Sequence, residues 1–290
     1  MMNKVKTMKV RQFGPWLWLL ACLPGMATAS DIASSVSSGV DNRFADGGYF
    51  ELGGSVFSVN KVDVRQTDYE PVQASLLISG TYQYKGLFVE MIHQSQDGIN
   101  LGVNFWNSEN WSLDLLVANL QSSWARPEGI DPSELDEAGR NAYLMSEESL
   151  YIGAGFRATR YWGDHYVFQY RLMADYYDDQ GVLSTARLGK SWQVRNWNFH
   201  MLGSIEYVSS KLNRHLFGVK ANEATELFPE YTPDDSFNYG VELGVAYPLS
   251  ENCVFRAMYR LNMLSDEVTN SPFNRADHVS FFNASVSYVF

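Results

Sequence analysis

The sequence predicts an all-β protein: a single transmembrane antiparallel β-barrel of about 12 strands behind a cleaved N-terminal signal peptide. Three observations lead to this prediction. Apolar and polar residues alternate through most of the 290 residues, the connections between alternating segments are short at one end and long at the other, and aromatic residues gather at segment ends. We expect a signal peptide at 1–29, a periplasmic leader at 30–46 and the barrel at 47–290.

The first 29 residues have the three parts of an export signal. "MMNKVKTMKVRQ" is basic without an acid, "FGPWLWLLACLPG" is a short apolar run, and "ATA" ending at Ala29 matches an A-x-A cleavage site. The run is too short for a spanning helix, which needs about 20 apolar residues. "LLAC", ending at Cys22, also resembles a lipobox, in which Cys22 would be acylated and begin the mature chain. Both routes export the protein.

Charge and cysteine content exclude two further classes. Without residues 1–29 the chain keeps 18 Lys and Arg against 33 Asp and Glu, a balance of −15. Such a surface repels phosphates, so we expect no nucleic-acid partner. Cys253 would be the only cysteine after cleavage at Ala29, which excludes an intramolecular disulfide.

Alternation with a period of two indicates strands with one apolar face. In "VQASLLISGTYQY", Val72, Leu76 and Tyr82 share one face, and Gln73 and Ser75 share the other. The connection 131–149 is the only one that suggests a helix, with Asp131 and Ser133 as possible caps. The predicted strands are 48–59, 72–84, 86–94, 98–106, 111–121, 149–161, 164–177, 181–192, 196–208, 236–248, 251–263 and 279–290.

The lengths of the connections predict how the barrel is oriented. Turns after every even-numbered strand are short, whereas long segments follow the first (60–71), fifth (122–148), ninth (209–235) and eleventh (264–278) strands. Bacterial transmembrane barrels have short periplasmic turns and long external loops. With an even strand number, both termini lie on the periplasmic side of a Gram-negative outer membrane.

Two soluble alternatives fit the alternation less well. Sandwich strands are usually about 5–6 residues long, shorter than many of the predicted segments. A soluble barrel would have its apolar residues inside, whereas aromatic residues at strand ends are typical of membrane interfaces. These residues are Tyr84, Trp106, Trp111, Trp162, Tyr166, Tyr176, Trp192, Trp197, Tyr207, Tyr247 and Tyr288.

Charged residues on the polar face are expected to form ion pairs inside the barrel. Glu206 and Glu242, on the ninth and tenth strands, face the eleventh strand, so Glu242 can pair with Arg256 or Arg260. Such pairs either brace a narrow interior or line an ion-selective pore. The inward charged residues are Glu90, Asp114, Arg157, Arg171, Asp175, Arg187, Glu206, Glu242, Arg256 and Arg260.

We find no pattern that indicates catalysis, a cofactor or a metal. His200, Ser204 and Glu206 share one face of a strand, but His200 and Ser204 are about 13 Å apart at the usual strand rise. The sequence contains neither G-x-S-x-G nor H-E-x-x-H. The loop acids do not follow the spacing of a calcium loop. We therefore expect a protein that is not an enzyme.

Four segments resemble the MipA/OmpV family of outer-membrane proteins: "QASLLISGTYQYKGLFVE", "YIGAGFRATRYWG", "HLFGVKANEATELFPEYTPDD" and "YGVELGVAYPLSENCVFRAMYRLNMLSDEVTNSPF". The resemblance runs from about residue 48 to the C-terminus, and 216–273 is its most specific part. The chain departs from the family at Cys253, where we expect an aromatic residue, and at Asn270, where an acid is common. The resemblance implies a scaffold that brings a lytic murein transglycosylase together with a murein synthase.

These observations predict a structural scaffold for cell-envelope machinery in the outer membrane, with a narrow porin-like channel as the alternative. The expected partners are outer-membrane lipid, the barrel-insertion machinery and, from the resemblance, the two murein enzymes. The periplasmic turns and the leader 30–46 would contact the enzymes, and loops 122–148 and 209–235 would suit surface recognition. The last strand resembles an assembly signal, in which Tyr288 and Phe290 are read by the insertion machinery.

Overall fold

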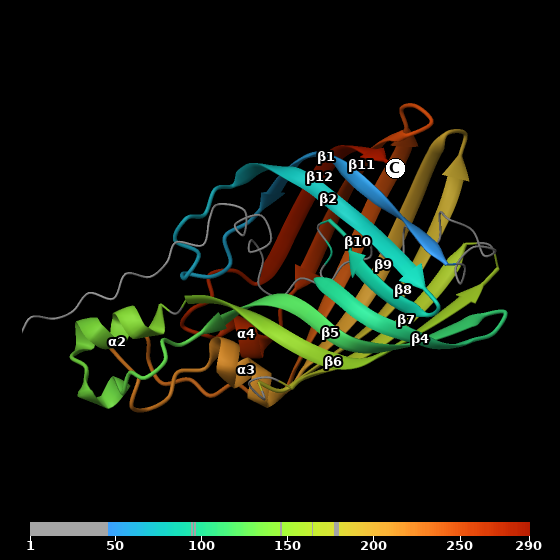
Figure 1. Cartoon of the computed structure of the whole chain (residues 1–290). Helices are drawn as coiled ribbons and strands as arrows, with labels where there is room; N and C mark the ends of the chain where they lie inside the picture. Colours follow the sequence, from blue (N-terminus) through green and yellow to red (C-terminus); the bar gives the residue numbers. More distant parts are fainter. Residues whose placement is uncertain (1–45, 94, 96, 146, 164, 177–179) are drawn as a thin grey trace, which may run out of the picture.

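The computed structural model describes residues 46–290 except residues 94, 96, 146, 164 and 177–179. The predicted signal peptide and residues 30–45 of the predicted leader therefore lie outside the described residues. Twelve antiparallel strands form a closed barrel, in which β1 pairs with both β2 and β12 (Figure 1). The strands are β1 (Gly47–Val59), β2 (Val72–Tyr84), β3 (Leu87–Met91), β4 (Ile99–Asn107), β5 (Trp111–Ala125), β6 (Glu147–Trp162), β7 (Tyr166–Asp175), β8 (Val182–Val194), β9 (Trp197–Val208), β10 (Ser236–Pro248), β11 (Cys253–Met263) and β12 (His278–Val289).

The predicted fold class is confirmed, and the strands lie where the alternation places them. The fifth strand is longer than expected, since it ends at Ala125 rather than at 121. The third strand is shorter: the expected range is 86–94, but β3 ends at Met91. There the chain leaves the barrel wall and turns inward, as described below.

The distribution of side chains is the inverse of that in a soluble protein, because apolar residues cover the outside and polar residues fill the inside. Exposing such an apolar outer surface to water would be energetically unfavourable, whereas contact with the hydrocarbon chains of lipid is favourable. The outward residues that are more than a third exposed include Leu52, Val56, Leu76, Leu101, Leu115, Leu172, Leu188, Met201, Ile205, Val241, Leu243, Phe282 and Val286. The buried polar residues include Glu51, Ser55, Asn100, Asp114, Asn119, Arg157, Arg171, Arg187, Glu242, Arg260, Asn283 and Ser287.

Aromatic side chains pair near the end of the barrel that carries the short turns. Trp162 stacks on Tyr166 with ring centroids 6.0 Å apart, and Trp197 contacts Tyr247 at 4.5 Å. Aromatic rings at this level are typical of the interface between lipid and water.

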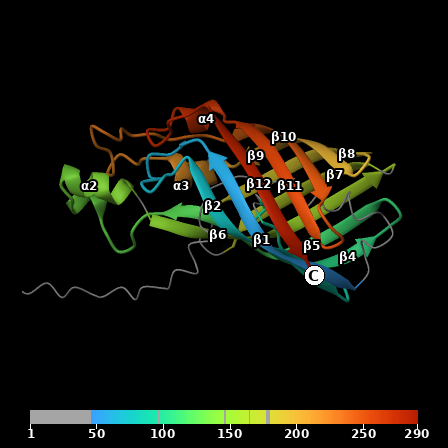
Figure 2. The same ribbon diagram turned by 90° about the horizontal axis from the view of Figure 1, so that it is seen from above.

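Short helices gather at the other end, which we call the external end (Figures 1 and 2). They are η2 (Pro132–Glu134), α2 (Glu137–Leu144), α3 (Ser210–Phe217) and α4 (Asp266–Thr269). None of the helices in the described part of the chain is long and apolar enough to cross a membrane.

The helices differ in part from the sequence prediction. The expected helical segment 131–149 is divided into η2 and α2, whose N-caps are Asp131 and Asp136. Ser133 is not a cap, because its backbone N–H donates to the Asp131 carboxylate at 2.9 Å. The view that only this connection is helical is wrong, since Ser209 caps α3 within the predicted loop 209–235.

Candidate functional site within the barrel

The connection between β3 and β4 crosses the inside of the barrel. His93 Nε2 lies 2.9 Å from Oγ of Ser55 on β1, whereas the Asp97 carboxylate contacts Arg187 on β8. In the closed ring of strands, β7 and β8 lie on the far side from β1. The described residues of this connection, 92, 93, 95, 97 and 98, which we call the inward segment, therefore reach from one wall of the barrel to the other.

Asp97 holds the end of the inward segment. Its two carboxylate oxygens accept hydrogen bonds from the Arg187 guanidinium at 2.7 and 2.8 Å, and the same carboxylate forms an ion pair with Arg171. Gly98 follows with a φ of +64°, and a Cβ at this position would lie 1.9 Å from the carbonyl oxygen of Leu120. Glycine is therefore required for the chain to turn back into the wall.

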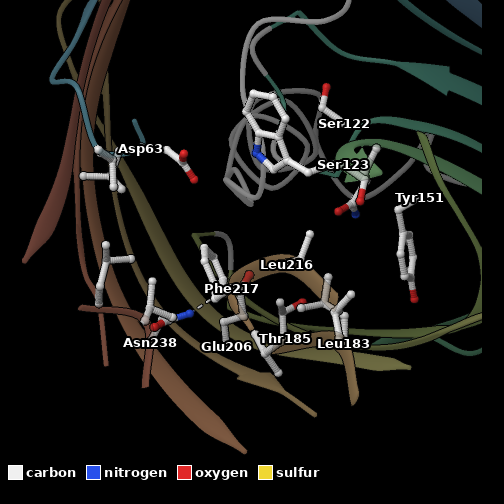
Figure 3. Close-up of a pocket in the computed structure, with 18 of the residues that line it drawn as sticks. Asp63, Ser122, Ser123, Tyr151, Leu183, Thr185, Glu206, Leu216, Phe217 and Asn238 are labelled. Atoms are coloured by element: carbon white, nitrogen blue, oxygen red, sulfur yellow. Dashed lines mark hydrogen bonds between the residues drawn. The ribbon is translucent and has the colours of Figure 1, made fainter. Parts of the chain in front are cut away.

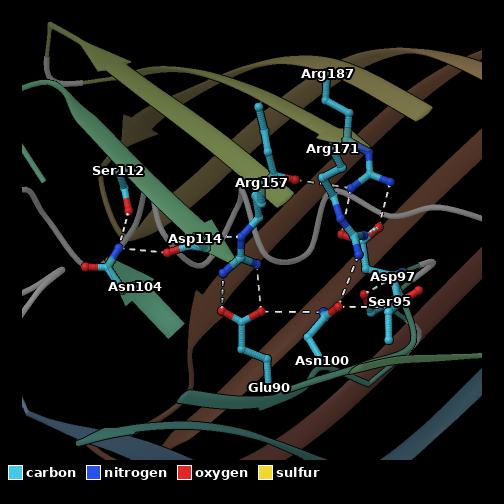
Figure 4. A network of polar contacts seen from close by, with 12 residues as sticks. Glu90, Ser95, Asp97, Asn100, Asn104, Ser112, Asp114, Arg157, Arg171 and Arg187 are labelled. Atoms are coloured by element: carbon cyan, nitrogen blue, oxygen red, sulfur yellow. Dashed lines mark hydrogen bonds and ion pairs between the residues drawn. The ribbon is translucent and has the colours of Figure 1, made fainter. Parts of the chain in front are cut away.

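Three inward arginines on consecutive strands explain why an extra acid is needed. Arg157 on β6 and Arg171 on β7 stand directly opposite each other, an arrangement that repels unless acids neutralise it. Arg157 donates to Glu90 at 2.7 and 2.9 Å and to Asp114 at 2.8 Å. Glu90 and Asp114 pair with Arg157, and Asp97 pairs with both Arg171 and Arg187, the third arginine, on β8. The six side chains form two clusters inside the barrel, and Asn100 links them by donating to Glu90 at 3.5 Å and accepting from Arg171 at 3.1 Å (Figure 4).

This network is shielded from water, which raises the cost of breaking it. Asp97 is 1% exposed, Arg187 1% and Arg171 2%. Asn100 adds an acceptor to Arg171 at 3.1 Å. Removing one partner of a buried ion pair leaves an uncompensated charge and typically costs about 3–5 kcal/mol. The inward segment is thus held firmly in the lumen.

The four residues predicted as an internal ion-pair network fall into separate groups. Glu242 and Arg260 stand opposite each other on β10 and β11, and Arg260 Nε donates to Glu242 Oε2 at 2.8 Å. His200 Nε2 lies 3.0 Å from the other oxygen of Glu242. Glu206 does not join them: among the described residues it accepts a hydrogen bond from its strand partner Asn238 at 3.1 Å.

Arg256 pairs with Glu51 rather than Glu242, because its β10 partner is Ala246. The guanidinium donates to the Glu51 carboxylate at 2.7 and 2.9 Å. The Ser287 hydroxyl on β12 donates to Glu51 at 2.8 Å and lies 2.9 Å from Arg256. The pair therefore reaches over β12 and links β11 to β1 where the barrel closes.

Tyr288 and Phe290 lie on the outside of the same closure. The Phe290 N–H donates to the carbonyl of Phe50 on β1 at 2.9 Å, and the two rings are 6.0 Å apart. The Tyr288 ring is 4.8 Å from that of Phe290. Both side chains are exposed, and their role as an assembly signal stays a prediction.

A cavity of about 120 Å³ occupies the external end of the barrel, between the inward segment and α3. Figure 3 shows Leu216 and Phe217 of α3 among the residues around it. Asp97 and Arg171 line it from the inward-segment side, and Leu212, Leu216 and Phe217 line it from the helix. Its other walls come from several strands and from connections 60–71 and 264–278.

The external connections pack into a roof over this cavity. The Arg65 guanidinium lies 4.8 Å from the Trp124 ring and 4.4 Å from the Phe273 ring, and it donates to Asp63 at 2.9 and 2.6 Å. The connection between β5 and β6 also contacts the connection between β9 and β10, for example through Arg126, which donates to the Gly218 carbonyl at 2.9 Å. Burial lowers the pKa of Arg126, while nearby Glu223 opposes that shift.

Sequence reasoning missed Asp97, Glu51 and the cavity. Asp97 lies in "SQDG", which reads as an external polar loop. A signal was present: three inward arginines lie on consecutive strands, and an acid in the connection before the fourth strand is close enough in the chain to be considered as a partner. Glu51 gave no such signal, because 205 residues separate it from Arg256.

The described residues contain no group of three or more His, Cys, Asp and Glu side chains placed to hold a metal ion. His200, which shares a strand face with Ser204, bonds to Glu242.

A closed twelve-stranded barrel with an apolar exterior, aromatic ends and a charged, filled interior is an outer-membrane β-barrel. Residues 52–290 match the family described as MltA-interacting protein MipA. The chain belongs to this family.

Comparisons with solved structures return other barrels at low identity. The Ralstonia pickettii toluene transporter TbuX has 10% identity and a TM-score of 0.41, over 96% of this chain and 97% of that one. The Pseudomonas putida toluene transporter TodX has 13% identity and a TM-score of 0.41, over 86% and 91%. A Pseudomonas aeruginosa FadL homologue has 10% identity and a TM-score of 0.39, over 84% and 91%. At these scores the likeness supports no inference about function. No curated protein matches the sequence.

Proposed function

We propose that the protein is a non-enzymatic scaffold in the outer membrane that docks murein-hydrolysing and murein-synthesising enzymes. The observation that carries the proposal is the filled lumen: the inward segment crosses it, and buried ion pairs tie that segment to the far wall. A barrel braced in this way is suited to hold a rigid surface rather than to pass solutes. The family description, MltA-interacting protein, supports a murein transglycosylase as the partner.

The periplasmic turns offer that rigid surface. Lys85 and Arg195 have φ values of 49° and 56°, so each is held in a tight turn between paired strands. Both side chains are exposed, on a chain that carries 33 acids against 22 bases. We place these two bases in the contact with the periplasmic enzymes, together with the leader 30–46.

Affinity capture from solubilised envelopes tests the proposal. The tagged protein is expected to recover a lytic murein transglycosylase and a murein synthase. The double variant Lys85→Glu, Arg195→Glu should reduce recovery about tenfold, whereas Lys220→Glu, whose side chain is 80% exposed at the external end, should not. Recovery of neither enzyme by the native protein would contradict the scaffold.

A narrow channel is the second candidate, favoured by one observation. Three arginines face three acids within one part of the lumen, and rings of charged side chains are how ion-selective pores are built. In planar bilayers the scaffold proposal expects no steady single-channel current. Discrete currents from the native barrel, with an ion selectivity that changes in Arg187→Met, would replace the scaffold by the channel.

A further inference from the structure

The cavity at the external end has the size and lining of a small-molecule site. Many of its wall residues are apolar, including Leu183, Val208, Leu212, Leu216 and Val279. Its volume of about 120 Å³ is close to the roughly 150 Å³ of an apolar protein cavity that binds benzene. One six-membered ring with a short substituent would fill it.

Three residues of the lining each carry a buried polar atom that has no hydrogen-bond partner among the described residues. These atoms are Ser123 Oγ, Trp124 Nε1 and the Tyr151 hydroxyl, on side chains of residues only 3%, 5% and 4% exposed. Buried polar atoms are rarely left unpaired in native proteins, so each of these atoms points to an absent partner. An indole N–H can only donate, and both hydroxyls can donate, so the missing partner must supply an acceptor.

Trp124 is fixed in place, which prevents its N–H from finding another acceptor. Its ring lies against the Arg65 guanidinium at 4.8 Å, and its backbone carbonyl is 2.8 Å from His215 Nε2. The donor is therefore organised before a ligand arrives, which limits the entropy lost on binding.

The charges around the cavity favour a neutral ligand. Among the acids that line it, Asp63 pairs with Arg65, and Asp97 pairs with Arg171 and Arg187. These arginines already have carboxylate partners, so an anion would have to displace one of those carboxylates. An ammonium group would leave the indole N–H unpaired, because it has no acceptor.

We propose that this cavity binds a small, uncharged, mainly apolar molecule that carries a hydrogen-bond acceptor such as a carbonyl oxygen. The acceptor lies against Trp124 Nε1 or Ser123 Oγ, and the apolar body packs against α3 and the neighbouring strands. This site is independent of the periplasmic scaffold surface.

Three probes of similar size test the site: acetophenone, α-methylstyrene, in which a CH₂ group replaces the carbonyl oxygen, and benzoate, which is charged. Equilibrium binding is measured on the full barrel in lipid nanodiscs, with empty nanodiscs subtracted. We expect saturable binding of acetophenone, about fivefold weaker binding of α-methylstyrene because one hydrogen bond is lost, and no saturable binding of benzoate. Equal affinity for acetophenone and α-methylstyrene would overturn the proposal, as would preferred binding of benzoate.

Variants locate the binding in the cavity. Trp124→Phe should weaken acetophenone about fivefold and leave α-methylstyrene unchanged, and Ser123→Ala provides the same comparison if Trp124→Phe does not fold. Leu216→Trp fills the cavity and should abolish binding of both probes, whereas Leu227→Trp, at a residue 59% exposed outside the cavity, should preserve it. Unchanged acetophenone binding in a folded Leu216→Trp barrel would overturn the proposal.

Discussion

Asp97 and Arg187 form a two-pronged ion pair inside the barrel, at 2.7 and 2.8 Å, although 90 residues separate them in the chain. The pair ties the inward segment to β8, while His93 at the other part of that segment reaches Ser55 on β1. One acidic residue outside the strands therefore holds the inward segment across the middle of the barrel.

Asp97→Asn should lower the free energy of unfolding by about 3–5 kcal/mol, because Arg171 and Arg187 would lose their buried carboxylate. Unfolding in denaturant, followed by the band shift of heated and unheated protein, measures this change. Asp68→Asn, at an exposed residue of connection 60–71, is the matched control and should stay within about 0.5 kcal/mol of the native value. Equal stability of the two variants would show that the inward segment is not braced by this pair.

Arg260→Met should lower the free energy of unfolding more than Arg256→Met does, because the first ion pair is more deeply buried than the second. The Arg260 side chain is 3% exposed and that of Arg256 is 40% exposed. Removing Arg260 leaves the Glu242 carboxylate without its cation and away from water, which should lower the free energy of unfolding by about 3–5 kcal/mol. Water can reach the Arg256 site, so Arg256→Met should lower it by only about 1–2 kcal/mol. The same unfolding assay compares them, and a larger loss for Arg256→Met would contradict this ranking.

Gly53→Ala should prevent proper closure of the barrel, whereas Gly54→Ala should not. A Cβ at Gly53 would lie 2.1 Å from the carbonyl oxygen of Val286 on β12, and a Cβ at Gly54 would meet nothing within 4 Å. Gly54→Ala should leave stability unchanged or raise it by up to about 1 kcal/mol, since it restricts the unfolded chain. The yield of folded barrel from refolding into detergent distinguishes the two variants. Equal yields would show that the contact between β1 and β12 can widen locally.

Acid should loosen the attachment of α3. Asp235 accepts a hydrogen bond from the Ser210 N–H at 2.5 Å, and this bond holds the pKa of its carboxyl below the ordinary value of 3.8. Because the pKa of Asp235 is lowered in the folded state, its carboxylate contributes fully to the stability of the folded protein above about pH 3.8. This contribution is lost as the pH falls through the lowered pKa of the folded state. Hydrogen-exchange protection of α3 should therefore fall below pH 3.8 in the native protein. In Asp235→Ala it should be low at every pH, and Asp68→Ala should behave as the native protein does.

Phe290→Ala should reduce assembly into the membrane much more than it reduces synthesis. The change removes the ring contact with Phe50 and one of the two aromatic residues of the predicted assembly signal. Folded barrel in outer-membrane fractions, divided by total protein, measures assembly. Phe282→Ala, at an outward residue of the same strand that is 45% exposed, is the control. A similar loss in both variants would indicate a general need for apolar surface rather than an assembly signal.

Local periodicity explains how much of the fold could be predicted. Alternation is a property of neighbouring residues, so it located twelve strands and their lipid faces before any contact was known. Glu242 and Arg260 were predicted to lie within reach because consecutive strands of a meander are neighbours, and they do pair. Helix α3 could also have been predicted, since Ser209 followed by Leu212 and Leu216 has the pattern of a capped amphipathic helix.

The sequence by itself thus determined the strands, their inward and outward faces, and the position of the long connections. Tertiary structure alone decided three other features: the path of the inward segment to Arg187, the Glu51–Arg256 pair across the closing strand, and the cavity beside Trp124. Each depends on groups brought together by ring closure or by the path of a non-repetitive connection. Periodicity carries no information about either, because both are set by which distant charges and side chains meet once the barrel is closed.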